Sequence, residues 1–158
     1  MTFSYKILKN DVLIDLLKKF FALTPSMNPE KATILTIDDE SLIRESYRFY
    51  LEDNGYQVLE AENGRVGLEM IHKHRPDLVL VDLRMPEIDG FTVLKEVHKD
   101  HPDLPIIVIS GTGIIGDAEE AMKAGAWSCL LKPIGDLSSL CVAVEQALEK
   151  KAQLTEEN

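Results

Sequence analysis

Three short runs of apolar residues constrain the fold of this chain more than any other feature of its sequence. They lie at residues 32–37, 78–81 and 105–109, and they show little alternation between polar and apolar side chains. This pattern is typical of strands in a parallel sheet, because helices cover both faces of such a sheet. Two further strands are expected over residues 56–61 and 127–131.

A helix is expected after each of these strands. Apolar residues recur there at helical spacing, and glycine or proline marks several of the ends. The expected helices cover residues 41–54, 63–74, 91–99, 117–124 and 136–154. Parallel strands need long crossover connections, which helices usually supply. The five strand–helix units therefore predict an α/β fold with a doubly wound, five-stranded parallel sheet.

The first thirty residues differ from the rest of the chain. Residues 1–30 carry a net charge of +1, whereas the whole chain carries −10 and the remainder therefore −11. Residues 5–23 show a broad apolar stripe at helical spacing, and PSMNP at 25–29 is typical of a linker. We expect an N-terminal amphipathic helix and linker over 1–30, a domain over 31–150, and the start of a linker helix or tail over 151–158. The apolar stripe should dock on the domain or pair in a homodimer.

Charge and hydropathy exclude several classes of protein. A net charge of −10 is a poor match for nucleic acid or for an anionic membrane surface. No run of apolar residues is long enough for a transmembrane helix, and the N-terminus has no secretory signal. The cysteines, Cys129 and Cys141, have no metal-binding or redox spacing. We expect a cytoplasmic protein with two reduced thiols.

Side chains with chemical function follow four of the five expected strands. In chain order they are Asp38, Asp39, Glu40, Asp82, Ser110 and Lys132. The carboxyl ends of parallel strands meet at one edge of the sheet, which is where ligands bind in folds of this class. We therefore expect these side chains to converge.

Converging carboxylates repel one another, so a cation must compensate them. Mg²⁺ suits one or two carboxylates together with water and a phosphate. Lys132 would supply a second positive charge for phosphoryl oxygens, and Ser110 a hydroxyl donor. The chain has no GxxxxGK[ST] loop for a nucleotide, but a carboxylate can itself accept a phosphoryl group. Asp82, which is central among these residues, is the predicted acceptor.

These motifs resemble the receiver domain of two-component response regulators. The resemblance covers residues 31–150 and rests on DDE at 38–40, DLRMPEIDG at 82–90, SG at 110–111 and GAWSCLLKP at 125–133. It implies a flavodoxin-like sheet with the strand order 2-1-3-4-5. It also implies a signalling switch that is not an enzyme beyond accepting and hydrolysing its own phosphoryl group.

The resemblance assigns roles to the residues at this edge. In that family, the aspartate that matches Asp82 accepts a phosphoryl group from the phosphohistidine of a histidine kinase or phosphotransfer protein. The hydroxyl of Ser110 and the amine of Lys132 would hold the phosphoryl oxygens. The peptide bond before Pro133 is expected to be cis.

The family also implies a Mg²⁺ site. Asp39, Asp82 and the backbone carbonyl of Arg84 would bind the ion, and Asp38, the other member of the acidic pair, would assist. The side chain of Arg84 would overhang the site. It either modulates water access and the lifetime of the phosphoryl group or is a solvated surface arginine.

One position departs from the family pattern. Receivers usually carry Tyr or Phe three residues before the motif lysine, and that ring moves inward on activation. Here the position is Cys129. Trp127, two residues earlier, should point to the same side of the sheet if it lies in the strand. It either takes over the role of the ring or only packs a hydrophobic surface.

The output is not specified by the sequence. The segment LLKPIGDLSSL at 130–140 resembles receivers fused to serine/threonine phosphatase modules and the related stress-response adaptors. The expected last helix resembles the linkers that join receivers to downstream effectors. The chain is either a stand-alone receiver or a piece of a longer protein.

Two other functions remain open beside the phosphorylation switch. A degenerate receiver would act as a constitutive protein-binding module, which the atypical Cys129 allows. A Mg²⁺-dependent phosphatase would also use an aspartyl phosphate, but it needs a second Asp two residues after Asp82, where this chain has Arg84. Turnover of a small phosphate ester would favour the phosphatase, and partner binding indifferent to Asp82→Ala would favour the binding module.

Overall fold

The computed structural model describes Leu16 and residues 32–158, apart from residues 112–114. Its sheet has five parallel strands in the order β2-β1-β3-β4-β5, which confirms the predicted fold class and strand order. The strands are β1 (Thr33–Ile37), β2 (Gln57–Ala61), β3 (Leu78–Asp82), β4 (Ile106–Ser110) and β5 (Ser128–Leu131). The helix predicted over residues 5–23 lies, apart from Leu16, outside the described residues.

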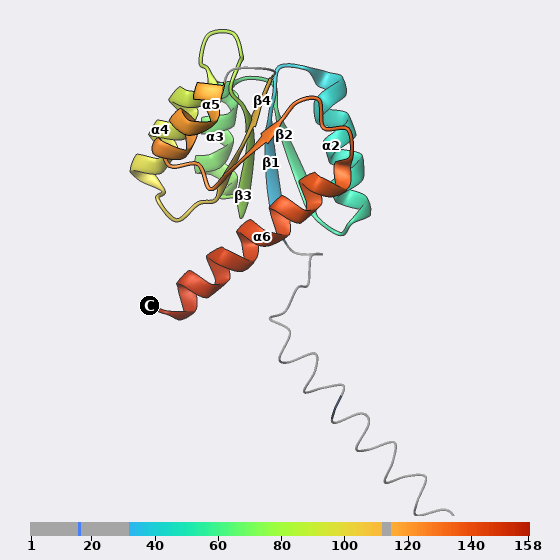
Figure 1. Ribbon diagram of the computed structural model, residues 1–158, viewed down its shortest axis with the longest axis vertical. Coiled ribbons are helices and arrows are strands. Elements are labelled where there is room, and N and C mark those ends of the chain that lie inside the picture. The colour runs from blue at the N-terminus through green and yellow to red at the C-terminus, as the bar shows by residue number, and fades with distance from the viewer. Residues whose placement is uncertain (1–15, 17–31, 112–114) are drawn as a thin grey trace, which may run out of the picture.

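Helices cover both faces of the sheet, as the doubly wound prediction requires (Figure 1). They are α2 (Ser41–Asp53), α3 (Gly64–His74), α4 (Gly90–Asp100), α5 (Ile115–Lys123) and α6 (Leu137–Glu156). Side chains of α3, α4 and α5 pack on one face, and side chains of α2 and α6 pack on the other. Among the described residues, no helix is both long enough and apolar enough to cross a membrane.

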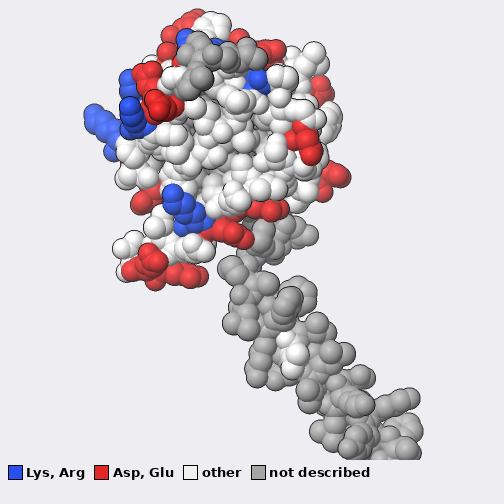
Figure 2. Space-filling model, in the orientation of Figure 1, with Lys and Arg blue, Asp and Glu red and all other residues white. Residues whose placement is uncertain are grey.

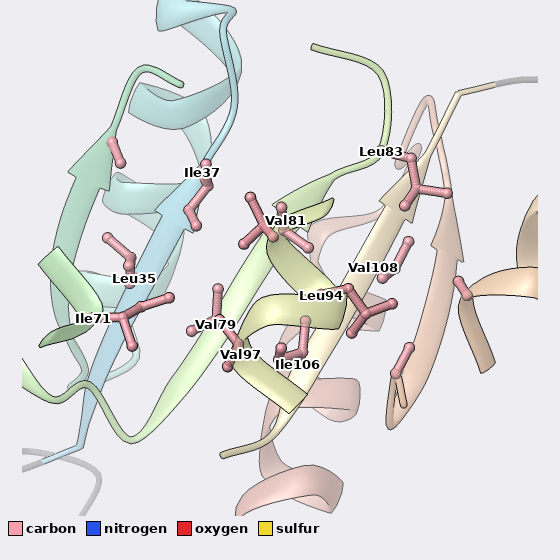
Figure 3. Close-up of a cluster of buried hydrophobic side chains, with 14 of the residues drawn as sticks. Leu35, Ile37, Ile71, Val79, Val81, Leu83, Leu94, Val97, Ile106 and Val108 are labelled. Atoms are coloured by element: carbon pink, nitrogen blue, oxygen red, sulfur yellow. The ribbon is translucent and has the colours of Figure 1, made fainter. Parts of the chain in front are cut away.

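The central strands contribute side chains to two separate hydrophobic cores, one on each face of the sheet. In β1, β3 and β4, alternate side chains point to opposite sides of the sheet. One set packs beneath α3, α4 and α5 and includes Leu35, Ile37, Val79, Val81, Ile106 and Val108 (Figure 3). The other packs beneath α2 and α6 and includes Ile34, Leu78, Leu80, Ile107 and Ile109. Both sets are buried, which explains why the sequence of these strands shows so little polar alternation.

Charged side chains lie around the edge of the face of the domain that Figure 2 shows, with uncharged surface between them. Acidic groups are spread over several parts of that edge, and basic groups gather mainly at its left side. On the described part of this face, no continuous basic stripe is seen of the kind that tracks a nucleic acid backbone.

The loop after β3 is held by a helix cap and by backbone contacts. Asp89 caps α4, because its Oδ1 accepts a hydrogen bond from the Thr92 N–H at 2.9 Å. The Gly90 N–H donates to the Leu83 carbonyl at 3.0 Å, which closes the loop against the end of β3. The first turn of α4 is therefore packed directly against the segment that begins at Asp82.

We expect Gly90→Ala to lower the free energy of unfolding by about 2 kcal/mol, as overpacking of a tight contact does. A Cβ at Gly90 would meet the carbonyl oxygen of Asp82 and would lie 2.7 Å from the Leu83 Cα. Both are backbone atoms that cannot rotate away. Urea unfolding measures the loss. Gly135→Ala is the matched control, because its Cβ meets nothing within 4 Å, and an equal loss there would contradict the prediction.

Candidate functional site

Three carboxylates converge at the carboxyl edge of the sheet, as the strand ends predict. Asp38 follows β1, and Asp82 is the last residue of β3. Both are buried, with 2% and 5% of their surface exposed, whereas Asp39 is exposed. Carboxylate oxygens of Asp38, Asp39 and Asp82 lie within 4.8 Å of one another. The structure thus places residues from two different strand ends in one acidic cluster.

The Lys132 ammonium lies between the two buried carboxylates. Its Nζ is 2.7 Å from Asp38 Oδ2 and 3.2 Å from Asp82 Oδ2, with Glu40 Oε1 further away at 3.8 Å. The side chain is only 14% exposed. Its position follows from the end of β5, where the Lys132 N–H donates to the Ser110 carbonyl at 2.7 Å. The peptide bond from Lys132 to Pro133 is cis, as the family resemblance implied.

Backbone N–H groups hold the other oxygen of each buried carboxylate. The Arg84 N–H donates to Asp82 Oδ1 at 3.2 Å, and the Glu40 N–H donates to Asp38 Oδ1 at 2.9 Å. Arg44 adds a bond from Nη1 to the Asp38 carbonyl at 2.8 Å. In each carboxylate, one oxygen therefore contacts the Lys132 ammonium and the other accepts a hydrogen bond from a backbone N–H.

The electrostatics of the cluster favour an additional cation. Burial, reinforced by the Asp38 charge, raises the pKa of Asp82, although Lys132 and the Arg84 N–H oppose the shift. Burial alone would lower the pKa of Lys132, but its hydrogen bond to Asp38 and the charges of Asp38 and Asp82 raise it above the ordinary value. Lys132 thus stays charged at neutral pH. The negative charge of the carboxylates nevertheless exceeds the positive charge of this one ammonium.

The donor set fits a divalent cation with a preference for oxygen. All three groups of the cluster offer carboxylate oxygens, and three carboxylates against one ammonium leave two negative charges. Mg²⁺ is bound in proteins by one or two carboxylates, with water and phosphate completing its shell. Asp38, Asp39 and Asp82 therefore fit such an ion in composition and in spacing.

Ser110 lies at the same edge of the sheet. It ends β4, and the register pairs Asp82 with Ile109 and Ser110 with Leu131. The side chain is buried, and its Oγ donates to the Gly111 carbonyl at 3.1 Å. The sheet thus places this residue between the end of β3, which carries Asp82, and the end of β5, which Lys132 follows.

A family model for the response regulator receiver domain matches residues 34–145. The chain belongs to this family. Receivers form a signalling family and not a family of enzymes, and phosphorylation on aspartate is characteristic of them.

Known receivers resemble the chain in sequence and in structure. The transcriptional regulatory protein GlrR of Escherichia coli is 37% identical over 131 residues, which cover 83% of this chain but only 29% of GlrR. A receiver domain protein from Clostridium thermocellum is 36% identical with a TM-score of 0.74, over 78% of this chain and 98% of that protein. NtrX from Brucella abortus is 35% identical with a TM-score of 0.76, over 79% of this chain and 29% of NtrX. The receiver thus spans less than a third of GlrR and of NtrX.

The side chain of Arg84 pairs with an acidic residue that the sequence patterns did not single out. Its Nη2 lies 3.0 and 2.9 Å from the two carboxylate oxygens of Asp117, in the first turn of α5. The Asp117 charge reinforces the effect of burial in raising the pKa of Cys129. No strand end or motif marks Asp117. The only sequence signal is an acidic residue in the first turn of an expected helix.

The two residues of the predicted switch region lie on opposite faces of the receiver's sheet. Cys129 packs against the core beneath α3, α4 and α5, whereas Trp127 packs against the core beneath α2 and α6. Lys150 Nζ lies 5.1 Å from the centroid of the Trp127 ring. The prediction that both side chains share one side was therefore wrong. Sides alternate regularly only within a strand, and β5 begins at Ser128, after Trp127.

Proposed function

We propose that this receiver is a phosphorylation-dependent switch that accepts a phosphoryl group on Asp82. The donor would be the phosphohistidine of a histidine kinase or of a phosphotransfer protein. The observation that carries the proposal is the buried Asp82 carboxylate, which Lys132 Nζ approaches to 3.2 Å beside the acidic cluster. Membership of the receiver family supports the same chemistry.

The residues of the site have complementary tasks in this reaction. A carboxylate oxygen of Asp82 attacks phosphorus, the phosphorus–nitrogen bond breaks, and the donor imidazole leaves. The Lys132 ammonium and the Ser110 hydroxyl stabilise the transferred phosphoryl oxygens. Mg²⁺, held by Asp38, Asp39, Asp82 and the Arg84 carbonyl, would supply further positive charge for those oxygens. The ion would also offset the repulsion between a carboxylate nucleophile and an anionic phosphoryl group.

The output of the switch would be a downstream effector, either a further domain or a separate protein. GlrR and LuxO, the latter from Vibrio campbellii and 37% identical over 121 residues, are named as regulatory proteins, and the chain covers only 29% and 26% of them. Helix α6 continues without a break to Glu156, past the predicted end of the receiver at residue 150. This continuous helix supports a role for residues 151–158 as the start of a linker.

Incubation with acetyl phosphate and Mg²⁺ should add one phosphoryl group to the wild-type chain and none to Asp82→Ala. Asp82 is the predicted nucleophile, so its removal eliminates the acceptor and not merely a contact. Intact mass spectrometry measures the adduct. Asp103→Ala, which changes an exposed aspartate, is the matched control and should be phosphorylated normally.

Two results would contradict this assignment. An adduct that persists on Asp82→Ala would place the acceptor elsewhere. If neither acetyl phosphate nor the mimic beryllofluoride reacts with or binds to the wild-type chain, a constitutive protein-binding module would explain the fold better than a switch.

A further inference from the structure

Arg84 connects the acceptor to the helix that follows β4. Its main-chain N–H donates to Asp82 Oδ1 at 3.2 Å, while its side-chain Nη2 contacts both oxygens of Asp117 at 3.0 and 2.9 Å. Asp117 lies in the first turn of α5, seven residues after the Ser110 hydroxyl. One residue thus contacts the predicted phosphoacceptor through its backbone and the first turn of α5 through its guanidinium.

The two partners in this ion pair differ in burial. The Asp117 side chain is only 9% exposed, whereas that of Arg84 is 61% exposed. A buried carboxylate is costly unless it is paired, so Asp117 depends on the guanidinium. Arg84 has no comparable need, because water reaches most of its side chain. The guanidinium can therefore leave Asp117 for another anion at little cost to itself.

We propose that Asp117 and a phosphoryl group on Asp82 compete for the Arg84 guanidinium. Asp117 is then a positioning residue, which acts through Arg84 and sets how strongly the receiver holds its phosphoryl group. The inference rests on the proposed function, because it takes Asp82 as the acceptor. It goes beyond that function in giving Asp117 a role that none of the site motifs includes.

Charge and geometry both favour this competition. A phosphoryl group carries a charge of about −1.5 to −2 and offers three oxygens, more than the single charge of Asp117. Arginine binds phosphoryl oxygens in a bidentate manner and keeps its charge at every accessible pH. Arg84 is also two residues from Asp82, and Lys132 occupies the other oxygen of that carboxylate. The Arg84 main chain therefore already contacts the oxygen of the acceptor that Lys132 does not.

The competition has a consequence for α5. When Arg84 turns to the phosphoryl group, the buried Asp117 carboxylate loses its partner, and the first turn of α5 is destabilised. Coupling between two sites is reciprocal, so whatever favours the Arg84–Asp117 pair must weaken the hold on the phosphoryl group by the same factor. Phosphorylation and the contact that fixes α5 thus oppose each other.

Binding of beryllofluoride in the presence of Mg²⁺ tests the proposal on four versions of the chain: wild type, Asp117→Asn, Arg84→Gln and the double variant. Fluorine NMR measures bound beryllofluoride. We expect Asp117→Asn to bind about fivefold more tightly than wild type, because Arg84 is released, and Arg84→Gln to bind about fivefold more weakly. In the Arg84→Gln background, Asp117→Asn should change affinity by less than about twofold, since its effect needs the arginine.

Further measurements separate this role from a merely structural one. Asp117→Glu, which restores the charge, should return the affinity toward wild type. Hydrogen–deuterium exchange in the first turn of α5 should become faster when beryllofluoride binds to the wild-type chain. A loss of folding in Asp117→Asn would appear as weaker binding, which is the opposite of the expected sign.

Several results would overturn the inference. Unchanged or weaker binding by Asp117→Asn would do so, and so would a fivefold gain that persists without Arg84, because the gain would then come from removal of a nearby negative charge. A wild-type chain that fails to bind beryllofluoride would instead overturn the proposed function, and this inference with it.

Discussion

The substitution Lys132→Met is expected to lower the free energy of unfolding at pH 7 by about 3 kcal/mol, the usual cost of leaving a buried charge without its partner. Lys132 Nζ lies 2.7 Å from Asp38 and 3.2 Å from Asp82, and both carboxylates are buried. Without the ammonium, two negative charges face each other in the protein interior. Urea unfolding of the wild-type chain and the variant measures the difference.

The pH dependence of the destabilisation distinguishes the loss of the Lys132 charge from the loss of its packing. Burial already raises the pKa of Asp82, and removal of Lys132 raises it further, so Asp82 becomes neutral at a higher pH in the variant than in the wild-type chain. The destabilisation should therefore shrink as the pH is lowered from 7 and Asp82 becomes neutral. Lys95→Met, on the exposed surface of α4, is the matched control and should be nearly neutral. A penalty that is constant with pH would mean that the lysine acts through its aliphatic stem.

The fold was predictable because its strands are unusually simple. In β3 and β4 every residue is buried, so the apolar runs carry no polar interruption that could be confused with a surface strand or helix. The strand order came from the family resemblance and not from periodicity, because burial patterns do not say which strands are neighbours. The bounds of α5 and α6 were the least accurate, each off by two residues at one end and by one at the other.

The acidic cluster was predictable for a topological reason. The carboxyl ends of parallel strands lie at one edge, so any functional residues at those ends must meet. The Arg84–Asp117 pair had no such signal. Its partners are 33 residues apart, and one lies in a loop and the other in a helix, so no rule of strand ends brings them together. The sides of the sheet on which Trp127 and Cys129 lie were predicted wrongly for a related reason. They depend on where β5 begins, and the sequence does not locate the start of a strand to within one residue.

Asp82→Asn is expected to raise the melting temperature at pH 7 in the absence of divalent metal by about 3 °C, which corresponds to roughly 1 kcal/mol in a chain of this size. The folded-state pKa of Asp82 is raised. Stability from this group is therefore present below the ordinary carboxyl pKa and is lost as the pH rises through the raised value. Above the raised pKa, the ionised carboxylate destabilises the fold relative to a neutral amide of the same shape.

With Mg²⁺ present, the wild-type chain should have a higher melting temperature than Asp82→Asn. An ion that binds only the folded state adds about 2.7 kcal/mol at one hundred times its dissociation constant, so wild type should gain melting temperature with rising Mg²⁺. Asp82→Asn lacks one carboxylate of the cluster and should gain far less. Calorimetric melting with and without Mg²⁺ measures both changes, and Asp103→Asn, on the exposed surface, should behave as wild type. An equal gain in Asp82→Asn would place the ion outside this cluster. The higher stability of Asp82→Asn without Mg²⁺ and its smaller gain with Mg²⁺ have one cause. The site carries more negative charge than the folded protein alone can stabilise, and this excess charge attracts the cation.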